Sequence, residues 1–282
     1  MKFSLAYSPC PNDTYIFEAL AHHRIREQFD YDIDLKDVQE LNQDAIKGKY
    51  DISKISFAAY PFIADEYEIL DSGAALGFDC GPLLIARENI QPNEVAINRL
   101  KIAIPGVNTT ANLLFSIAFP QAKNKDEMLF SQIEDAVLSG EVDAGIIIHE
   151  TRFTFQEKGL HQIIDLGLHW QKTYRLPIPL GCIVVKRSLP EDLKLEIEFQ
   201  IRKSLQNSRK NEREAMPYIK EHAQTMDYSV MRQHIDLYVN DYTASLGEYG
   251  RKSILFLFEK GHELGLLPKI TQNIFVSAGP SI

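Results

Sequence analysis

The sequence predicts an α/β protein built from two units that face each other across a ligand-binding cleft. Short apolar runs of the length of buried strands alternate with helical patterns from residue 3 to residue 186. The alternation pauses at the polar stretch 88–98, which is typical of a connector between domains, and then restarts. Polar side chains follow several of the predicted strands, and ligands of open α/β sheets bind beyond the carboxyl ends of the strands.

The first unit is predicted to begin with a strand at residues 3–7. The prolines of Ser8-Pro9-Cys10-Pro11 end this strand, because proline cannot donate to a sheet ladder. Asn12-Asp13-Thr14 then offers good caps for the helical pattern at 15–22. A helix N-terminus has free N–H groups and a positive dipole end, so Ser8, Asn12 and Asp13 are candidate residues for binding an anion. An ordinary strand-to-helix turn explains the same spacing equally well.

A second candidate anion site lies further along the first unit. The sequence predicts strands at 31–35, 50–56 and 81–87 and a helix at 39–47. Lys54 and Ser56 lie two residues apart at the end of the 50–56 strand, so their side chains share one face. A lysine next to a hydroxyl and a new helix start suits anion recognition. The competing interpretation is a solvated surface lysine, which is the usual environment of this residue.

The second unit repeats the strand–loop–helix pattern. We expect strands at 100–104, 144–148 and 182–186 and helices at 111–119 and 127–138. The last strand follows a proline-bracketed crossover at 176–181. Thr109 and Thr110 precede the first of these helices and are candidate contacts for an anionic or hydroxylated ligand.

The C-terminal part of the chain is predicted to be helical. Four patterns are present, at 191–207, 211–224, 229–239 and 245–264. His222, His234 and His262 lie on these helices without metal-ligand spacing, and we interpret them as surface or packing residues. The expected domains are a larger lobe of residues 1–98 and 183–282 and a smaller lobe of residues 99–182.

The stretch 140–155 contains the candidate base. Its apolar run 144–148 ends abruptly in His149, Glu150 and Arg152. A histidine at the end of a buried strand is the natural candidate for acid–base chemistry near neutral pH, and a strand-capping histidine is the alternative. Glu150 or Asp13 would orient the imidazole. Arg152 would bind the substrate or form a structural ion pair, and the pattern favours neither role.

Composition narrows the class of ligand and the compartment. The net charge of −9 argues against nucleic-acid binding. Three scattered cysteines (Cys10, Cys80 and Cys182) suit a reducing compartment and form no CxxC metal motif, and a packing role is expected for Cys10. The N-terminus has no secretory pattern and no apolar run approaches the roughly 20 residues of a membrane helix, so a cytoplasmic protein without membrane insertion is expected. Monomer and homodimer both remain open.

Several motifs resemble one enzyme family over essentially the whole chain. They are Ser8-Pro-Cys-Pro-Asn-Asp-Thr-Tyr-Ile-Phe17, Lys54-Ile-Ser-Phe-Ala-Ala-Tyr60, Pro105-Gly-Val-Asn-Thr-Thr-Ala111, Gly145-Ile-Ile-Ile-His-Glu-Thr-Arg-Phe-Thr-Phe155 and Leu176-Pro-Ile-Pro-Leu-Gly181. Together they resemble the 1,4-dihydroxy-6-naphthoate synthase family of menaquinone biosynthesis by the futalosine route.

The resemblance implies a two-lobed fold of the type II periplasmic-binding-protein kind. It implies cleavage of cyclic dehypoxanthine futalosine, a small-molecule carboxylate, to 1,4-dihydroxy-6-naphthoate and dihydroxyacetone without a metal or organic cofactor. His149 falls on the proton acceptor of the family. The substrate-contact positions that the resemblance implies are Lys54, Ile55, Ser56, Thr109, Thr110 and Ala111.

Two other functions remain compatible with the sequence. Chorismate dehydratase has the same fold and belongs to the same pathway, although the segment from Ser8 to Phe17 disfavours it. A transport-type solute-binding protein also has this fold. Against it stand a histidine in the cleft and the absence of a signal peptide in the sequence.

Overall fold

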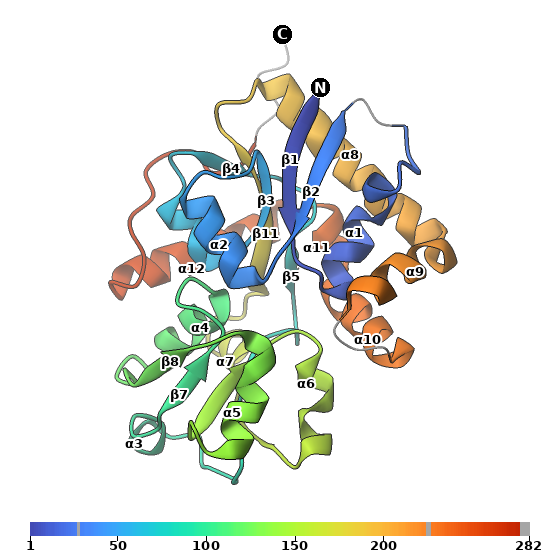
Figure 1. The fold of residues 1–282 in the computed structure, drawn as a ribbon. Coiled ribbons are helices and arrows are strands. Elements are labelled where there is room, and N and C mark those ends of the chain that lie inside the picture. Colours follow the sequence, from blue (N-terminus) through green and yellow to red (C-terminus); the bar gives the residue numbers. More distant parts are fainter. Residues whose placement is uncertain (27–28, 224–226, 277–282) are drawn as a thin grey trace.

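The computed structural model describes residues 1–26, 29–223 and 227–276, which form two α/β lobes (Figure 1). The N-terminus and the end of the described chain both lie in the larger lobe. Each lobe has its own sheet, and the chain passes between the lobes twice. The prediction of two α/β units is therefore confirmed.

The larger lobe contains a mixed six-stranded sheet in the order β2-β1-β3-β11-β4, with β5 also paired to β11. β1 is parallel to β2 and β3, whereas β11 is antiparallel to β3, β4 and β5. Its strands are β1 (Lys2–Tyr7), β2 (Asp30–Leu35), β3 (Ile52–Ser56), β4 (Tyr67–Ile69), β5 (Ala75–Gly77) and β11 (Ile178–Lys186).

Helices cover both faces of this sheet. The helices of the larger lobe are α1 (Pro11–Ala21), α2 (Val38–Ile46), the 3-10 helix η1 (Phe57–Phe62), α8 (Glu191–Lys210), α9 (Glu212–His222), α10 (Tyr228–Tyr238), α11 (Asp241–Ala244) and α12 (Gly247–Glu263). α1 packs against α8, α9 and α10, and their apolar side chains form one core with Leu5 and Ile183 of the sheet. On the other face, Val184 packs in a core with η1 and α12.

The smaller lobe contains a five-stranded sheet in the order β10-β6-β9-β7-β8. Its strands are β6 (Leu83–Ala86), β7 (Ile102–Ile104), β8 (Lys125–Glu127), β9 (Ala144–Ile147) and β10 (His161–Asp165). Its helices are α3 (Glu94–Ile97), α4 (Thr110–Ala118), the 3-10 helix η2 (Phe130–Gln132), α5 (Ile133–Ser139), α6 (Thr151–Thr154), the 3-10 helix η3 (Phe155–Lys158) and α7 (Leu166–Tyr174). Alternate residues of β6 and β9 enter opposite cores, as expected for strands covered on both faces.

The sheets place both crossings between the lobes earlier than the predicted boundaries at 98 and 182. β6 pairs with β9 and β10 of the smaller lobe, so the chain has already crossed before Leu83. The segment predicted as a crossover at 176–181 lies largely within β11, where Pro179 sits at a bulge. A fully apolar strand has no alternation, so its sequence does not reveal which sheet it joins.

Two helix boundaries also differ from the predictions. α1 begins at Pro11 rather than at residue 15, because a proline suits the first turn of a helix, where its missing N–H costs nothing. The helix expected at 127–138 is split into β8, η2 and α5. The predicted end of the 211–224 helix, at Gln224, lies outside the described residues. Among the described helices, none combines the length and the apolar character needed to span a bilayer.

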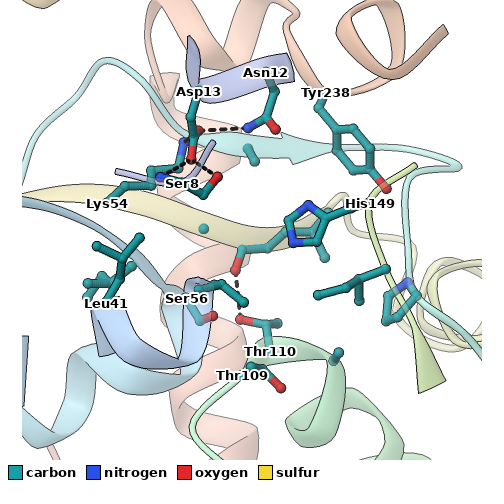
Figure 2. Close-up of a pocket in the computed structure, with 18 of the residues that line it drawn as sticks. Ser8, Asn12, Asp13, Leu41, Lys54, Ser56, Thr109, Thr110, His149 and Tyr238 are labelled. Atoms are coloured by element: carbon teal, nitrogen blue, oxygen red, sulfur yellow. Dashed lines mark hydrogen bonds and ion pairs between the residues drawn. The ribbon is translucent and has the colours of Figure 1, made fainter. Parts of the chain in front are cut away.

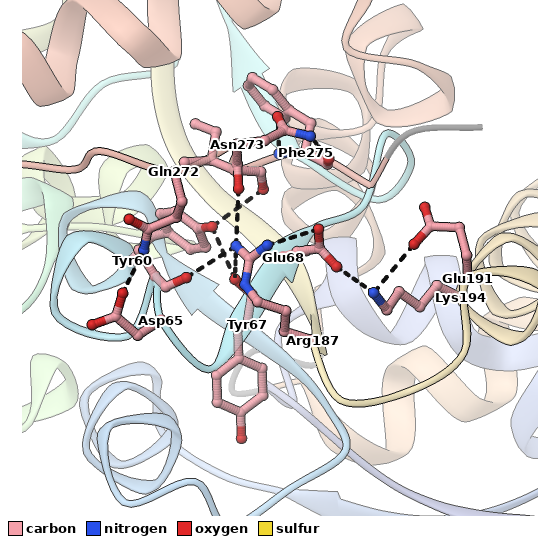
Figure 3. A network of polar contacts seen from close by, with 12 residues as sticks. Tyr60, Asp65, Tyr67, Glu68, Arg187, Glu191, Lys194, Gln272, Asn273 and Phe275 are labelled. Carbon is pink, nitrogen blue, oxygen red and sulfur yellow. Dashed lines mark hydrogen bonds and ion pairs between the residues drawn. The ribbon is translucent and has the colours of Figure 1, made fainter. Parts of the chain in front are cut away.

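The last described residues return to the edge of the larger sheet. Ile69 pairs in parallel with Phe275, and the backbone N–H of Ile69 donates to the carbonyl of Ile274 at 2.8 Å. The guanidinium of Arg187 donates to the carbonyls of Ala64, Tyr67 and Asn273 and to the carboxylate of Glu68 (Figure 3). One arginine therefore ties this C-terminal segment to the ends of β4 and β11.

Candidate active site

A cleft of about 700 Å³, including its open mouth, lies between the two lobes. The larger lobe lines it with residues that follow β1 and with the end of β3, and the smaller lobe lines it with the start of α4 and the residues that follow β9. The predicted site residues that line it are Ser8, Asn12, Asp13, Lys54, Ile55, Ser56, Thr109, Thr110, Ala111 and His149. Figure 2 shows His149 between two sets of polar side chains, one around Asp13 and one around Thr109.

A buried ion pair joins Lys54 to Asp13 on the larger-lobe side of the cleft. The Lys54 Nζ lies 2.9 Å from Asp13 Oδ1 and donates to the carbonyl of Gly73 at 2.7 Å. The same carboxylate accepts from Ser8 Oγ and from Asn12 Nδ2, each at 2.7 Å. Both partners of the pair are almost fully buried, so Lys54 is not the solvated lysine of the competing interpretation.

His149 follows β9 and has a left-handed backbone conformation, with φ of 60°. Such a conformation is uncommon for a residue with a Cβ and is found at functional sites. The imidazole lies 4.8 Å from the ring of Phe130, and its Nε2 makes no hydrogen bond to any described residue. Burial lowers the pKa of His149 to about 4, while the charge of Asp13 raises it and that of Lys54 lowers it. The imidazole is therefore neutral at pH 7.

His234 of α10, predicted to be a surface or packing residue, is a buried residue that lies beside His149 and also lines the cleft. The two imidazoles are almost parallel, with 6.0 Å between ring centroids and 9° between planes. His234 is fully buried, and its Nε2 lies 2.8 Å from Asn12 Oδ1. Burial lowers the pKa of His234 well below its usual value, and the neighbouring His149 lowers it further.

Asn42 and Thr110 join the two lobes near the candidate anion site. Asn42 bonds to Ser56 through both its amide nitrogen and its oxygen, and its nitrogen also donates to the carbonyl of Asn108 at 3.3 Å. Thr110 Oγ1 donates to the carbonyl of Leu180 at 2.7 Å and accepts from the N–H of Ala58. These contacts bring Ser56 to the start of α4, which lines the cleft.

Thr109 is the cap of α4. Its hydroxyl accepts from the N–H of Asn112 at 3.3 Å and donates to the carbonyl of Gly106 at 2.7 Å. A hydroxyl with both roles occupied has little capacity left for a ligand. Thr109 therefore acts on the cleft by fixing the helix terminus.

Arg152 does not line the cleft. Its guanidinium forms an ion pair with Asp165 at 2.8 Å and donates to the carbonyls of Asp79 and Gly81. It therefore fixes the loop through which the chain first crosses to the smaller lobe. Of the two roles expected for Arg152, the structure shows the structural ion pair.

One group of described side chains has metal-ligating atoms close together, within 4.8 Å of one another: Cys10, His149 and Glu150. Burial raises the pKa of the Cys10 thiol well above its usual value, and the charge of Glu150 raises it further. The thiol is therefore protonated at neutral pH, and the thiolate is the form that binds metals. This protonation supports the packing role predicted for Cys10.

The sequence reasoning missed three residues that shape the cleft: Asn42, His234 and Tyr238. Asn42 and His234 lie in the middle of amphipathic helices, where a polar residue is expected to face solvent. One signal was available for His234, since Met231, Ile235 and Tyr238 at helical spacing place it on the apolar face of α10.

The chain matches a protein-family model described as menaquinone biosynthesis over residues 3–263. It is 40% identical over 271 residues to the 1,4-dihydroxy-6-naphthoate synthase of Streptomyces coelicolor, covering 94% of this chain and 95% of the relative. It is 39% identical over 272 residues to the enzyme of the same name from Thermus thermophilus, covering 96% and 98%.

Solved structures share this fold. A protein of Archaeoglobus fulgidus superposes with a TM-score of 0.89 at 32% identity, covering 94% of this chain and 98% of that protein. The alkanesulfonate-binding protein of Xanthomonas axonopodis superposes with a TM-score of 0.70 at 10% identity, covering 98% and 96%. A Candida albicans protein, whose structure is described as having the generic periplasmic-binding-protein fold, gives 0.66 at 12% identity, covering 99% and 98%. These likenesses confirm the predicted two-lobed fold.

Proposed function

Because the chain belongs to the menaquinone-biosynthesis family and is a carbon–carbon lyase of the 1,4-dihydroxy-6-naphthoate synthase type, we propose that it cleaves cyclic dehypoxanthine futalosine with His149 as the general base. The products are 1,4-dihydroxy-6-naphthoate and dihydroxyacetone. The observation that carries the proposal is the neutral imidazole of His149, whose buried Nε2 makes no hydrogen bond to any described residue of the cleft.

The reaction requires a proton acceptor, a carbon–carbon cleavage and the formation of an aromatic diol ring. Aromatisation is strongly downhill, so the protein has to position one base and keep water away from a carbanion-like or enediol intermediate. His149 takes a proton from the substrate, and a retro-aldol-like cleavage follows. A positioned general base contributes about 10²- to 10⁴-fold to the rate, and two lobes that meet over the substrate provide orientation and exclude solvent.

The start of α4 suits the carboxylate of this substrate. The N–H groups of Thr110 and Ala111 lie in the first turn of a nine-residue helix, where a positive dipole end favours an anion. Ser56 accepts from Asn42, so its own hydroxyl hydrogen is available to the ligand. A carboxylate bound here also adds negative charge to the cleft and raises the pKa of His149 toward neutrality, which strengthens the base.

Replacing His149 tests the base role directly. His149→Asn is expected to lower kcat by about 10²- to 10⁴-fold, because asparagine cannot accept the proton. The dissociation constant of the substrate is expected to change little, since the groups at α4 remain. Stopped-time assays with mass-spectrometric detection of both products measure kcat, and calorimetric titration measures binding. Near-normal turnover would remove His149 from this role.

The choice of substrate separates the proposed function from the alternatives. Incubation with cyclic dehypoxanthine futalosine is expected to give both products, whereas chorismate is expected to stay unchanged. Loss of water from chorismate would instead identify a dehydratase. A compound that raises the melting temperature of the protein and is recovered intact would indicate a carrier.

A further inference from the structure

Rings from both lobes lie beside the imidazole of His149. Phe130, of the smaller lobe like His149 itself, lies 4.8 Å away between ring centroids. His234 lies at 6.0 Å with an almost parallel ring, and it belongs to α10 of the larger lobe. The base therefore has one ring neighbour from its own lobe, Phe130, and a second one, His234, that the larger lobe supplies.

A chain of hydrogen bonds fixes the orientation and the tautomer of His234. Asn12 Nδ2 donates to the Asp13 carboxylate, which Lys54 holds at 2.9 Å. Asn12 therefore presents its carbonyl oxygen to His234, and the His234 Nε2 at 2.8 Å must carry the proton. Its buried Nδ1 is then unprotonated in the neutral ring and lies 3.9 Å from Glu150 Oε2.

The groups that face the two imidazoles come from both lobes. From the larger lobe they are Cys10, Asp13, Lys54 and Tyr238, and from the smaller lobe Glu150. The charges of Asp13 and Lys54 act on His149 in opposite directions. The largest effect on the pKa of His149 is the exclusion of water, which penalises the charged form of a buried imidazole. The ring of His234 contributes to that exclusion on the side where the lobes meet.

We propose that His234 is a positioning residue for the base: the larger lobe delivers its neutral imidazole over that of His149, where it excludes water and keeps the base unprotonated while the lobes are together. The proposal rests on the proposed function only in taking His149 as the base. Separation of the lobes removes the cover and returns His149 to water, so the state of the base depends on the closure of the cleft.

Two variants separate the cover from the hydrogen bond to Asn12. His234→Gln keeps a donor for Asn12 but replaces the ring by a narrow chain, whereas His234→Phe keeps a ring and loses the donor. The pKa of His149 in each purified protein is measured by NMR titration of histidine-labelled samples without substrate. The signal of His149 is identified among those of the eight histidines as the one that is absent in His149→Asn. The control variant is His161→Ala, which replaces an exposed histidine of β10.

We expect His149 to titrate near 4 in the unchanged protein and in His234→Phe, and at least one pH unit higher in His234→Gln. The pH below which kcat falls is expected to rise together with this pKa, and to do so in His234→Gln alone. An unmoved pKa in His234→Gln, or an equal rise in both variants, would overturn the proposal. If the expected pKa pattern appears but the protein does not turn over cyclic dehypoxanthine futalosine, the proposed function fails and the role of His234 stands. If the protein turns this substrate over but the pKa of His149 does not move in His234→Gln, the proposed function stands and the role of His234 fails.

Discussion

Asp13 and Lys54 depend on each other, because each would otherwise be a buried charge in the wall of the cleft. Their side chains are 3% and 7% exposed, and the only direct cationic partner that the structure gives Asp13 among the described residues is Lys54. Lys54 also determines which way Asn12 faces, through the carboxylate that it holds. A change at this lysine is therefore expected to affect folding stability and the site together.

Lys54→Met is expected to lower the free energy of unfolding by about 3–5 kcal/mol, the usual cost of leaving one member of a buried ion pair alone. It is also expected to raise KM, since the chain from Asp13 to His234 loses its anchor. Urea unfolding and steady-state kinetics measure the two effects. Lys186→Met, which removes a partly exposed lysine 3.9 Å from Asp51, is the matched control and should cost about 0–1 kcal/mol.

A double variant tests the reason for the loss. Asp13→Asn removes the charge that Lys54→Met leaves behind, so the double variant is expected to be more stable than Lys54→Met alone. A double variant that loses the full sum of the single effects would contradict the ion pair as the cause.

At the scale of single residues, the sequence predicted the residues that follow strands better than those on helices. His149 stands immediately after a buried apolar run and Ser56 at the end of a buried strand, and a strand end limits where the next side chain can be. His234 is about 220 positions from Asn12 in the chain, and no local pattern records that contact. The partner of a buried polar group is set by tertiary packing, which is why the anchor of His234 could not be predicted.

At the scale of elements, the position of His149 depends on how closely β9 packs on α5. Gly145 lies in the middle of β9, and a Cβ added there would lie 2.3 Å from Ile133 Cγ2 and 3.0 Å from Val137 Cγ2. Those distances leave no room for a methyl group. The glycine therefore permits the close approach of strand and helix that fixes the end of the strand.

Gly145→Ala is expected to destabilise the protein by about 1–3 kcal/mol through overpacking. It is also expected to lower kcat, because His149 lies four residues after Gly145, just beyond the end of the displaced strand. Thermal unfolding and product formation measure these effects. In the background of Ile133→Ala, which removes the clashing methyl group, the same glycine substitution should cost less than it does alone. An unchanged cost would mean that the clash with Ile133 is not the cause.

The strand–helix order of each lobe was predictable because apolar runs and caps are local signals. The sequence could not show which of the two sheets β6 and β11 join. Both strands are covered on both faces, so their sequences are nearly continuous apolar runs. Only their pairing partners, distant in sequence, place the crossings.

At the scale of the whole molecule, the larger lobe is assembled from both ends of the chain. The network around Arg187 and Glu68 joins β4, the end of β11 and the C-terminal segment, and Lys194 of α8 completes it (Figure 3). This network lies away from the cleft, so it is expected to affect stability more than chemistry.

Arg187→Ala is expected to reduce the free energy of unfolding by roughly 1.5–3 kcal/mol, because it removes charged donors from three carbonyls and from Glu68. Trypsin cleavage after the exposed Lys269 should accelerate, since the segment that follows loses an anchor at Asn273. Lys260→Ala, which breaks an exposed pair with Glu263, is the control and should leave both measurements close to those of the unchanged protein. A cleavage rate that does not respond to Arg187→Ala would show that the segment is held by other contacts.

The return of the chain to its first lobe also sets the order in which the parts become available during synthesis on the ribosome. The last described strand of the smaller lobe ends at Asp165, so the sheet of that lobe and His149 can leave the exit tunnel before the larger sheet receives β11. α10, which carries His234, follows later still. A nascent chain interrupted before α10 therefore contains the base but not the ring that lies beside it, and the cleft is complete only after α10 has been made.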